Sequence, residues 1–188
     1  TNDIDLEYDE EFIGISVSSQ FSLSPNVVFA GTFDGDGHSI KRMKMGGIVW
    51  SVKPEDAPNG LGTVDTESSK RYFYRSFIGR LAGTVQNLSI AADCRIEGYS
   101  SLGGVVAVMN SGSLVYNCRN YADVMGWSTL IGGIAGDVND GAIISNCYNE
   151  GNITTAIMVA GGIAGRSAGR IERCANAGDV KALGLTSL

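Results

Sequence analysis

The sequence predicts an all-β chain that folds as a parallel β-helix, with coils of about 27–29 residues. Three observations support this prediction: a paired-glycine motif recurs at a fixed interval, a cysteine motif recurs with it, and the apolar runs between them are short. Periods of about 20 to 50 residues are typical of solenoids, propellers and other repeat arrays. Because one such unit cannot bury its apolar face alone, stacked units must share a continuous core.

The paired glycines set the period of the repeat. They stand at 103–104, 132–133 and 161–162, so successive pairs lie 29 residues apart. An earlier and weaker copy, FIGRLAG, occupies 77–83 and has Arg80 in the place of the second glycine. A glycine at a fixed place in each unit indicates a corner where two backbones approach closely.

Two further motifs recur with the glycines. Cys118, Cys147 and Cys174 are separated by 29 and 27 residues, and Leu88 holds the equivalent place in the earlier unit. Each unit then closes on an acid or amide residue followed by an apolar one, at 93–94, 123–124, 152–153 and 179–180. A single module over 1–188 therefore contains repeats at about 77–101, 102–130, 131–159 and 160–188.

The apolar runs within each unit indicate three short strands per coil. They are four to six residues long, are rich in β-branched residues and are interrupted by Gly, Asn and Asp. The first strand has the form GGIAG, the second AIISNC, and the third NIT or DVK. Helical repeats would need apolar residues at helical spacing over ten or more positions. Propeller blades would need about 40 residues and four strands.

Two regions depart from the repeat. Residues 1–49 form one or more irregular N-terminal coils, and residues 50–76 form an insertion loop that breaks the period. Trp50 begins the insertion, and an aromatic and basic cluster ends it, consisting of Tyr72, Phe73, Tyr74, Lys70, Arg71 and Arg75. Exposed aromatic rings could bind a sugar or a protein. The alternative is that these rings cap one end of the solenoid or continue a strand.

We expect the recurring cysteines to stack inside the coil as free thiols. Stacked α-carbons lie about 4.8 Å apart, and parallel side chains keep the β-carbons equally far apart, beyond the roughly 3.5–4.5 Å of a disulfide. With Cys147 facing inward, strand alternation places Ile143 and Ser145 inward as well. A catalytic thiol would need an exposed site beside a histidine, and the only histidine, His38, belongs to a different coil.

Asparagines flank the cysteine position in most units. Asn87, Asn117 and Asn146 precede it, whereas Asn120 and Asn149 follow it. Asn tolerates left-handed turns and can hydrogen-bond along a stack of identical residues. We therefore expect corner residues at all five positions.

The formal net charge of −6 arises at the start of the chain, where six acids and no base lie within 1–11. This stretch is interpreted as a solvated segment. The remaining charges balance, so no basic patch for nucleic acid is expected. No apolar run approaches the roughly 20 residues that cross a bilayer. No signal peptide is visible at a start that lacks methionine, which predicts a piece of a longer protein.

The stretch FAGTFDGDGHSIKRMKM, over 29–45, resembles the opening coil of bacterial surface proteins of Bacteroidetes type that carry the GLUG repeat. The GGIAG…NCYNEGNI units are similar to that repeat, and TNDIDL is similar to the strand that precedes the opening coil. Arg80 and Arg173 depart from the family pattern. The resemblance implies a right-handed parallel β-helix in a secreted or cell-surface protein, where the repeat is structural or adhesive. It implies no catalytic residue, and some members carry a metallopeptidase domain beside the repeat.

Asp34 and Asp36 in FDGDGHSI are the candidate metal ligands, because Ca²⁺ prefers clustered oxygens, and Asp3 or Asp5 could assist them. The alternative is a tight turn, in which Asp-Gly pairs supply the positive φ that corners require. The distal Glu of a calcium loop is missing. The sequence therefore favours the turn and predicts no cofactor.

A carbohydrate-active β-helix, either a polysaccharide lyase or a hydrolase, is the alternative to a non-catalytic module. A glycosidase needs two carboxylates about 5 to 10 Å apart across a groove, whereas the acids here lie mostly singly at turns. We therefore predict no enzymatic activity and no catalytic residues. The expected role is structural or adhesive, with an unidentified glycan or host protein as partner.

Overall fold

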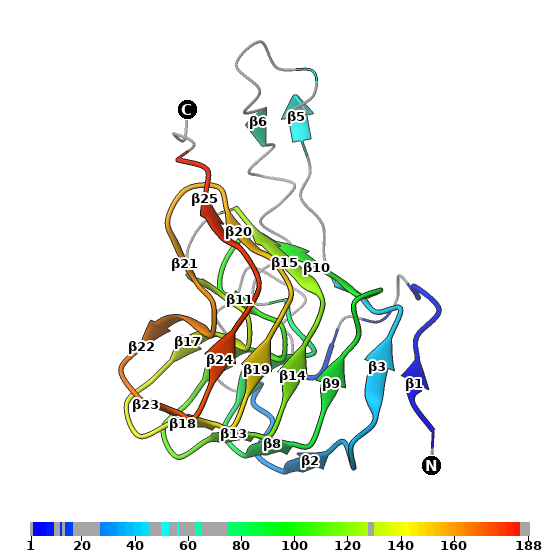
Figure 1. Cartoon of the computed structure of the whole chain (residues 1–188), viewed down its shortest axis with the longest axis vertical. Coiled ribbons are helices and arrows are strands. Elements are labelled where there is room, and N and C mark those ends of the chain that lie inside the picture. Colours follow the sequence, from blue (N-terminus) through cyan, green and yellow to red (C-terminus); the bar gives the residue numbers. More distant parts are fainter. Residues whose placement is uncertain are drawn as a thin grey trace.

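A computed structural model of the chain shows a β-solenoid of about four coils, built almost wholly from parallel strands (Figure 1). It describes residues 2–9, 12, 14–16, 27–45, 50–52, 56, 63–64, 75–127 and 130–184. Within these residues, no helix is long and apolar enough to cross a membrane. The predicted parallel β-helix is confirmed.

Five parallel sheets run along the solenoid, and we number them in the order in which one coil meets them. Sheet 1 contains β11 (Leu102–Gly103), β16 (Leu130–Gly132) and β21 (Val159–Gly161). Sheet 2 contains β7 (Ile78–Leu81), β12 (Val106–Met109), β17 (Ala135–Val138) and β22 (Ala164–Ser167). Sheet 3 contains β2 (Thr32–Asp34), β8 (Thr84–Gln86), β13 (Leu114–Tyr116), β18 (Ile143–Ser145) and β23 (Arg170–Glu172).

The remaining two sheets close each coil. Sheet 4 contains β1 (Ile4–Asp5), β3 (Ser39–Lys41), β9 (Ser89–Ile90), β14 (Arg119–Asn120), β19 (Tyr148–Asn149) and β24 (Ala175–Asn176). Sheet 5 contains β4 (Lys44–Met45), β10 (Arg95–Gly98), β15 (Asp123–Gly126), β20 (Ile153–Thr155) and β25 (Val180–Ala182). A complete coil therefore has five short strands, because the first two of the three predicted strands are each divided in two.

A left-handed residue divides the second predicted strand between sheets 3 and 4. Asn87, Asn117 and Asn146 have φ values of 52°, 50° and 55°, which confirms that these three are corner residues. Arg173 holds the same place in the last coil with a φ of 52°, so the corner persists where the asparagine is lost. Asn suits this place because its short polar side chain tolerates the left-handed conformation.

Because of this corner, the prediction that Ile143 faces inward together with Cys147 is wrong. Ile144 and Cys147 both belong to the core, with exposed fractions of 0% and 2%, whereas Ile143 is only partly buried. Strict alternation from Cys147 would have placed Ile143 inward. The non-extended Asn146 interrupts that alternation, so Ile144 and Cys147 can face the same side.

Pairing between coils corrects two predicted alignments. Arg80 pairs with Val108 inside sheet 2, so it does not replace the second glycine of a pair. Arg95 pairs with Asp123 in sheet 5, so the closing motif of that coil is 95–96 and not 93–94. Both errors fall in the coil that lacks the paired glycines, so no recurring motif fixed its alignment with the later coils.

The described part of the insertion is an antiparallel hairpin, β5 (Trp50–Val52) with β6 (Thr63–Val64), which stands apart from the stacked coils (Figure 1). The Trp50 side chain and the aromatic and basic residues of 70–74 lie outside the described part of the chain. Arg75 and Ser76 are buried, and the Ser76 hydroxyl donates a hydrogen bond to the Gly103 carbonyl at 2.7 Å. These two residues therefore belong to the coil and not to the insertion.

The two ends of the stack differ in how their apolar side chains are covered. At the N-terminal end, Phe33 meets Phe77 edge to face with ring centroids 5.1 Å apart, and Phe12 stacks on Phe77 at 6.3 Å. In the last coil, Ile171 and Val180 are 38% and 43% exposed. Their partners in the preceding coil, Ile144 and Ile153, are fully buried, so each coil depends on its neighbour to cover it.

Candidate functional site

A ladder of asparagine side chains is the most regular polar feature of the core. Asn120 and Asn149 are fully buried in sheet 4, so the prediction that they are corner residues is wrong. The Asn120 amide nitrogen donates to the Asn149 amide oxygen at 2.8 Å, and Asn149 donates to Asn176 at 2.7 Å. Each amide nitrogen also donates to the backbone carbonyl two residues further on, at 2.8 Å. The ladder thus joins three successive coils.

The ladder explains the second glycine of each pair. A β-carbon on Gly133 would lie 2.3 Å from Cγ of Asn149 and 2.2 Å from the carbonyl oxygen of Gly162. A β-carbon on Gly104 would meet Cγ of Asn120 at the same 2.3 Å. Only glycine therefore leaves room for the asparagine that ties neighbouring coils together.

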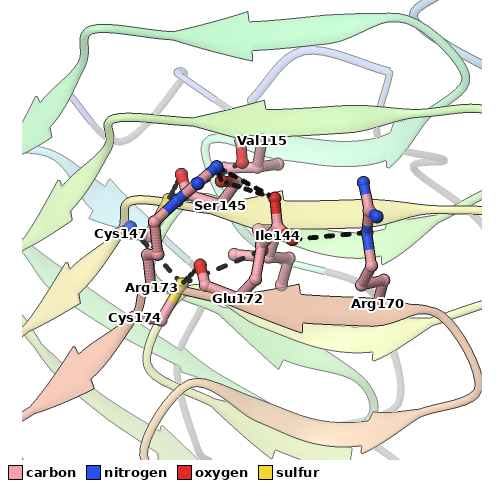
Figure 2. Close-up of polar contacts among 8 residues, drawn as sticks. All are labelled: Val115, Ile144, Ser145, Cys147, Arg170, Glu172, Arg173 and Cys174. Atoms are coloured by element: carbon pink, nitrogen blue, oxygen red, sulfur yellow. Dashed lines mark hydrogen bonds and ion pairs between the residues drawn. The ribbon is translucent and has the colours of Figure 1, made fainter.

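The recurring cysteines form a second stack, which Figure 2 shows for the last two coils. All three are free, and Cys118 and Cys147 are buried, whereas Cys174 in the last coil is half-buried. The backbone N–H of Cys118 donates to Sγ of Cys147 at 3.4 Å, and that of Cys147 donates to Sγ of Cys174 at 3.4 Å. The predicted stack of free thiols is confirmed.

None of the buried thiols combines a lowered pKa with access to solvent. The hydrogen bond with Cys147 lowers the pKa of Cys118, but Cys118 is fully buried. Contact with the Cys118 thiol and burial raise the pKa of Cys147 to about 12. Burial raises the pKa of Cys94, which lies at the edge of sheet 5, to about 11. A nucleophilic cysteine needs a lowered pKa and access to solvent. These side chains instead fill the core as small apolar groups.

The carboxylate of Asp34 is occupied by three hydrogen-bond donors. Oδ1 accepts the backbone N–H of Asp36 at 2.9 Å and the side-chain amide of Asn87 at 3.0 Å, while Oδ2 accepts the amide of Gln86 at 2.7 Å. These donors, Asp36 first, lower the pKa of Asp34. Asp36 and Gly37 follow with φ values of 51° and 79°. This is the geometry of the tight turn that the sequence favours over a calcium site.

The acidic start of the chain is paired with basic residues of the first coil. β1 lies beside β3, so Asp3 meets Lys41 at 2.7 Å and Asp5 accepts a hydrogen bond from Nε of Arg42 at 2.8 Å. These partners lower the pKa of both carboxyl groups. The interpretation of this stretch as merely solvated is therefore incomplete. Among the residues that the structure describes, no group of three or more His, Cys, Asp or Glu could hold a metal ion.

A half-buried carboxylate, that of Glu172, lies between two arginines on sheet 3 of the last coil (Figure 2). Glu172 accepts a hydrogen bond from Arg173 at 3.1 Å and another from the Ser145 hydroxyl at 3.3 Å. The Arg170 guanidinium lies 3.6 Å from its other oxygen. With its charge paired on two sides, Glu172 joins neighbouring coils and is not free for a ligand.

The outer surface of sheet 5 carries a hollow of about 460 Å³. Its polar lining comes from several coils: β10 and the turn before it, β15, the start of β20, and the N-terminal segment. The side chains that matter for its chemistry are Tyr8, Asp93, Arg95, Glu97, Asp123 and Asn152. Three carboxylates therefore line one hollow, whereas the sequence had suggested that acids lie mostly singly at turns.

The three carboxylates of the hollow differ in how they are engaged. Asp93 accepts the backbone N–H of Arg42 at 3.1 Å, and Asp123 accepts that of Asn152 at 2.8 Å, each through Oδ1. No hydrogen bond or ion pair engages the side chain of Glu97 within the described residues. Two of the carboxylates thus hold neighbouring coils in place, and the third is free.

A tyrosine forms one wall of the hollow. The guanidinium carbon of Arg95 lies 6.0 Å from the ring centroid of Tyr8, within the range of a cation–π contact. The backbone N–H of Tyr8 donates to the Arg42 carbonyl at 2.7 Å, which fixes this segment against the first coil. The hollow was missed in the sequence analysis because Asp93 was aligned there with Asp123. In the structure Arg95 pairs with Asp123, so the alignment was wrong by two residues.

Comparison of the chain with protein-family models, with curated proteins and with solved structures found no match.

Proposed function

We propose that the chain is a non-catalytic structural and adhesive module of a secreted or cell-surface bacterial protein. One observation carries this proposal: the residues that define the repeat are used for contacts between coils. The cysteines stack, Asn120 and Asn149 form the ladder, and Gly133 makes room for it. The repeat thus encodes a scaffold, and ligand recognition falls to side chains that differ from coil to coil. The resemblance to the GLUG repeat supports the same role and the same location.

An array of glycans and host proteins tests this proposal. The chain should bind at least one surface glycan, mucin or matrix protein, and should leave that ligand chemically unchanged. A complete lack of binding across the array would contradict the adhesive role, and cleavage of a bound glycan would contradict the absence of catalysis.

A second candidate function, a carbohydrate-active enzyme, is favoured by the hollow on sheet 5. Asp93, Glu97 and Asp123 line it together, and a glycosidase uses two carboxylates across a groove. New reducing ends or unsaturated products after incubation with polysaccharides would support this candidate, provided that Glu97→Gln abolishes them. We prefer the adhesive role because Asp93 and Asp123 each already hold a neighbouring coil through a backbone N–H.

A further inference from the structure

We propose that the hollow on sheet 5 is a binding site for a neutral sugar, such as one hexose unit of an oligosaccharide. This inference rests on the proposed adhesive function and names the ligand class of one particular site. Its volume of about 460 Å³ lies within the roughly 300–1,000 Å³ that is common for small-ligand sites. The hollow combines an aromatic ring with both hydrogen-bond donors and acceptors.

The ring of Tyr8 supplies an apolar surface at one side of the hollow. Tyr8 is 39% exposed, although its segment is anchored to the first coil through the Arg42 carbonyl. The Arg95 guanidinium lies over the ring, 6.0 Å from its centroid, within the range of a cation–π contact. An aromatic ring that is both exposed and held in place can pack against the C–H face of a sugar, because it is apolar on its faces and polar at its hydroxyl.

The carboxylates supply acceptors that the fold has left unused. Glu97 has no internal partner among the described residues, and Asp93 and Asp123 each use only Oδ1 for a backbone N–H. A carboxylate accepts hydrogen bonds at both oxygens, so each of these groups retains an acceptor for a sugar hydroxyl.

The same lining also offers donors. Arg95 carries five N–H groups, and the side-chain amide of Asn152 both donates and accepts. Because each sugar hydroxyl is a donor and an acceptor at once, a site with both kinds of group fits it better than an all-acidic or all-basic site would. Hydrogen bonds to the charged groups contribute most of the expected affinity.

The charge of the lining selects against anionic ligands. Three carboxylates face one guanidinium, so a uronic acid, a sialic acid or a phosphate would be repelled. A cationic side chain would be attracted by the carboxylates, but it would compete with Arg95 for the face of the Tyr8 ring. A neutral sugar avoids the repulsion and can use the donors of the lining as well as its acceptors, and a basic peptide is kept as an alternative outcome of the test.

The test is a titration of the chain with defined probes, followed by backbone amide shifts in NMR spectra. The probes are cellobiose, maltose, lactose and mannobiose as neutral sugars, digalacturonic acid as an acidic sugar, and tetralysine as a basic peptide. At least one neutral sugar should give saturable shifts at Glu97, Asp123 and Asn152. Digalacturonic acid and tetralysine should shift these residues less at the same concentration.

Isosteric variants locate the site. Glu97→Gln removes a charge that no internal contact uses, so the fold is kept, and the affinity for the neutral sugar should fall about tenfold, as expected for one charge-assisted hydrogen bond. Asp123→Asn should have a similar effect, because the amide oxygen can still accept the Asn152 N–H. Asp140→Asn, an exposed carboxylate outside the hollow, is the matched control and should bind as the unmodified chain does.

Different failures have different meanings. If a neutral sugar binds with equal affinity to Glu97→Gln, Asp123→Asn and the unmodified chain, the hollow is not the site, and the adhesive function stands. If tetralysine alone shifts the hollow residues, the ligand class is wrong. If no probe binds at the hollow and no glycan or host protein of the array binds to the chain, both the sugar site and the adhesive function are contradicted.

Discussion

Replacing Asn149 with alanine should lower the free energy of unfolding by about 3 kcal/mol. The side chain is fully buried and makes three hydrogen bonds: from Asn120 at 2.8 Å, to Asn176 at 2.7 Å and to the Gly151 carbonyl at 2.8 Å. Each bond contributes about 1 kcal/mol net, and a buried partner left unpaired adds about 1–3 kcal/mol. The loss should therefore fall within roughly 2–5 kcal/mol.

Thermal and urea unfolding, followed by far-UV circular dichroism, measure this loss. For a chain of this size, each 1 kcal/mol corresponds to about 2–4 °C, so the melting temperature should fall by roughly 6–12 °C. Asn152→Ala is the control, because Asn152 is exposed and its side chain accepts one bond, from the Asp179 N–H at 3.2 Å. Its loss should stay below about 1 kcal/mol.

A double-mutant cycle sharpens the same prediction. The change Asn120→Ala combined with Asn149→Ala removes both partners of one ladder bond, so the double variant should lose about 1 kcal/mol less than the sum of the single losses. Equal losses for Asn149→Ala and Asn152→Ala, or strict additivity in the cycle, would refute the role given to the ladder.

Three further predictions follow from the packing and the charges. Gly133→Ala places a β-carbon 2.2 Å from a backbone carbonyl and should cost about 1–3 kcal/mol or more, whereas Gly31→Ala, with its nearest atom at 3.4 Å, should change urea stability by less than about 0.5 kcal/mol; equal losses would contradict this packing. The pKa of Cys147 is about 12, so at neutral pH iodoacetamide should label it only after unfolding, and equal rates of labelling in native and unfolded chains would contradict its burial. The hydrogen bond from Arg42 lowers the folded-state pKa of Asp5 below 3.8, so its contribution to stability is present above that pH and is lost as the pH falls through the folded-state pKa. Between about pH 6 and pH 2, the melting temperature of Asp5→Asn should therefore fall less than that of the unmodified chain. An equal fall in both chains would rule out the pairing of Asp5 with Arg42.

The period of the repeat could be predicted because the same residue types recur at a fixed spacing in the sequence. Residues that recur at one spacing must occupy one place in successive coils, so the stack of Cys118 and Cys147 and the corner at Asn146 followed directly. The alignment failed in the coil where these motifs do not recur. The coil that begins at Arg75 lacks the paired glycines, and its alignment was wrong by four residues at the glycine motif and by two at the closing motif.

The direction in which a side chain faces was harder to predict than its position in the coil. A single left-handed residue at Asn146 reverses the alternation, and no propensity separates a left-handed asparagine from an extended one. Asn120 and Asn146 are the same residue type only a few positions from the same cysteine motif. Asn120 is buried in the ladder, where Gly104 leaves room for its side chain, whereas Asn146 forms the corner.

The hollow on sheet 5 could not be predicted because Tyr8, Arg95 and Glu97, which complete its lining, belong to no recurring motif. Arg95, Asp123 and Asn152 occupy one row of the sheet in three successive coils, yet they differ in type and charge. Tyr8 comes from outside the repeat, and its position depends on the pairing of β1 with β3. Such a site becomes visible only when the coils are placed in register.

The most direct test of the account is the hydrogen exchange of asparagine side-chain amides, measured by NMR. The central claim is that the repeat signature is used inside the solenoid, where Asn120 and Asn149 bond to each other and to the backbone. Their side-chain amides should exchange many-fold more slowly than the amide of the exposed Asn152. Exchange at the same rate for all three would show that the ladder does not hold the coils together.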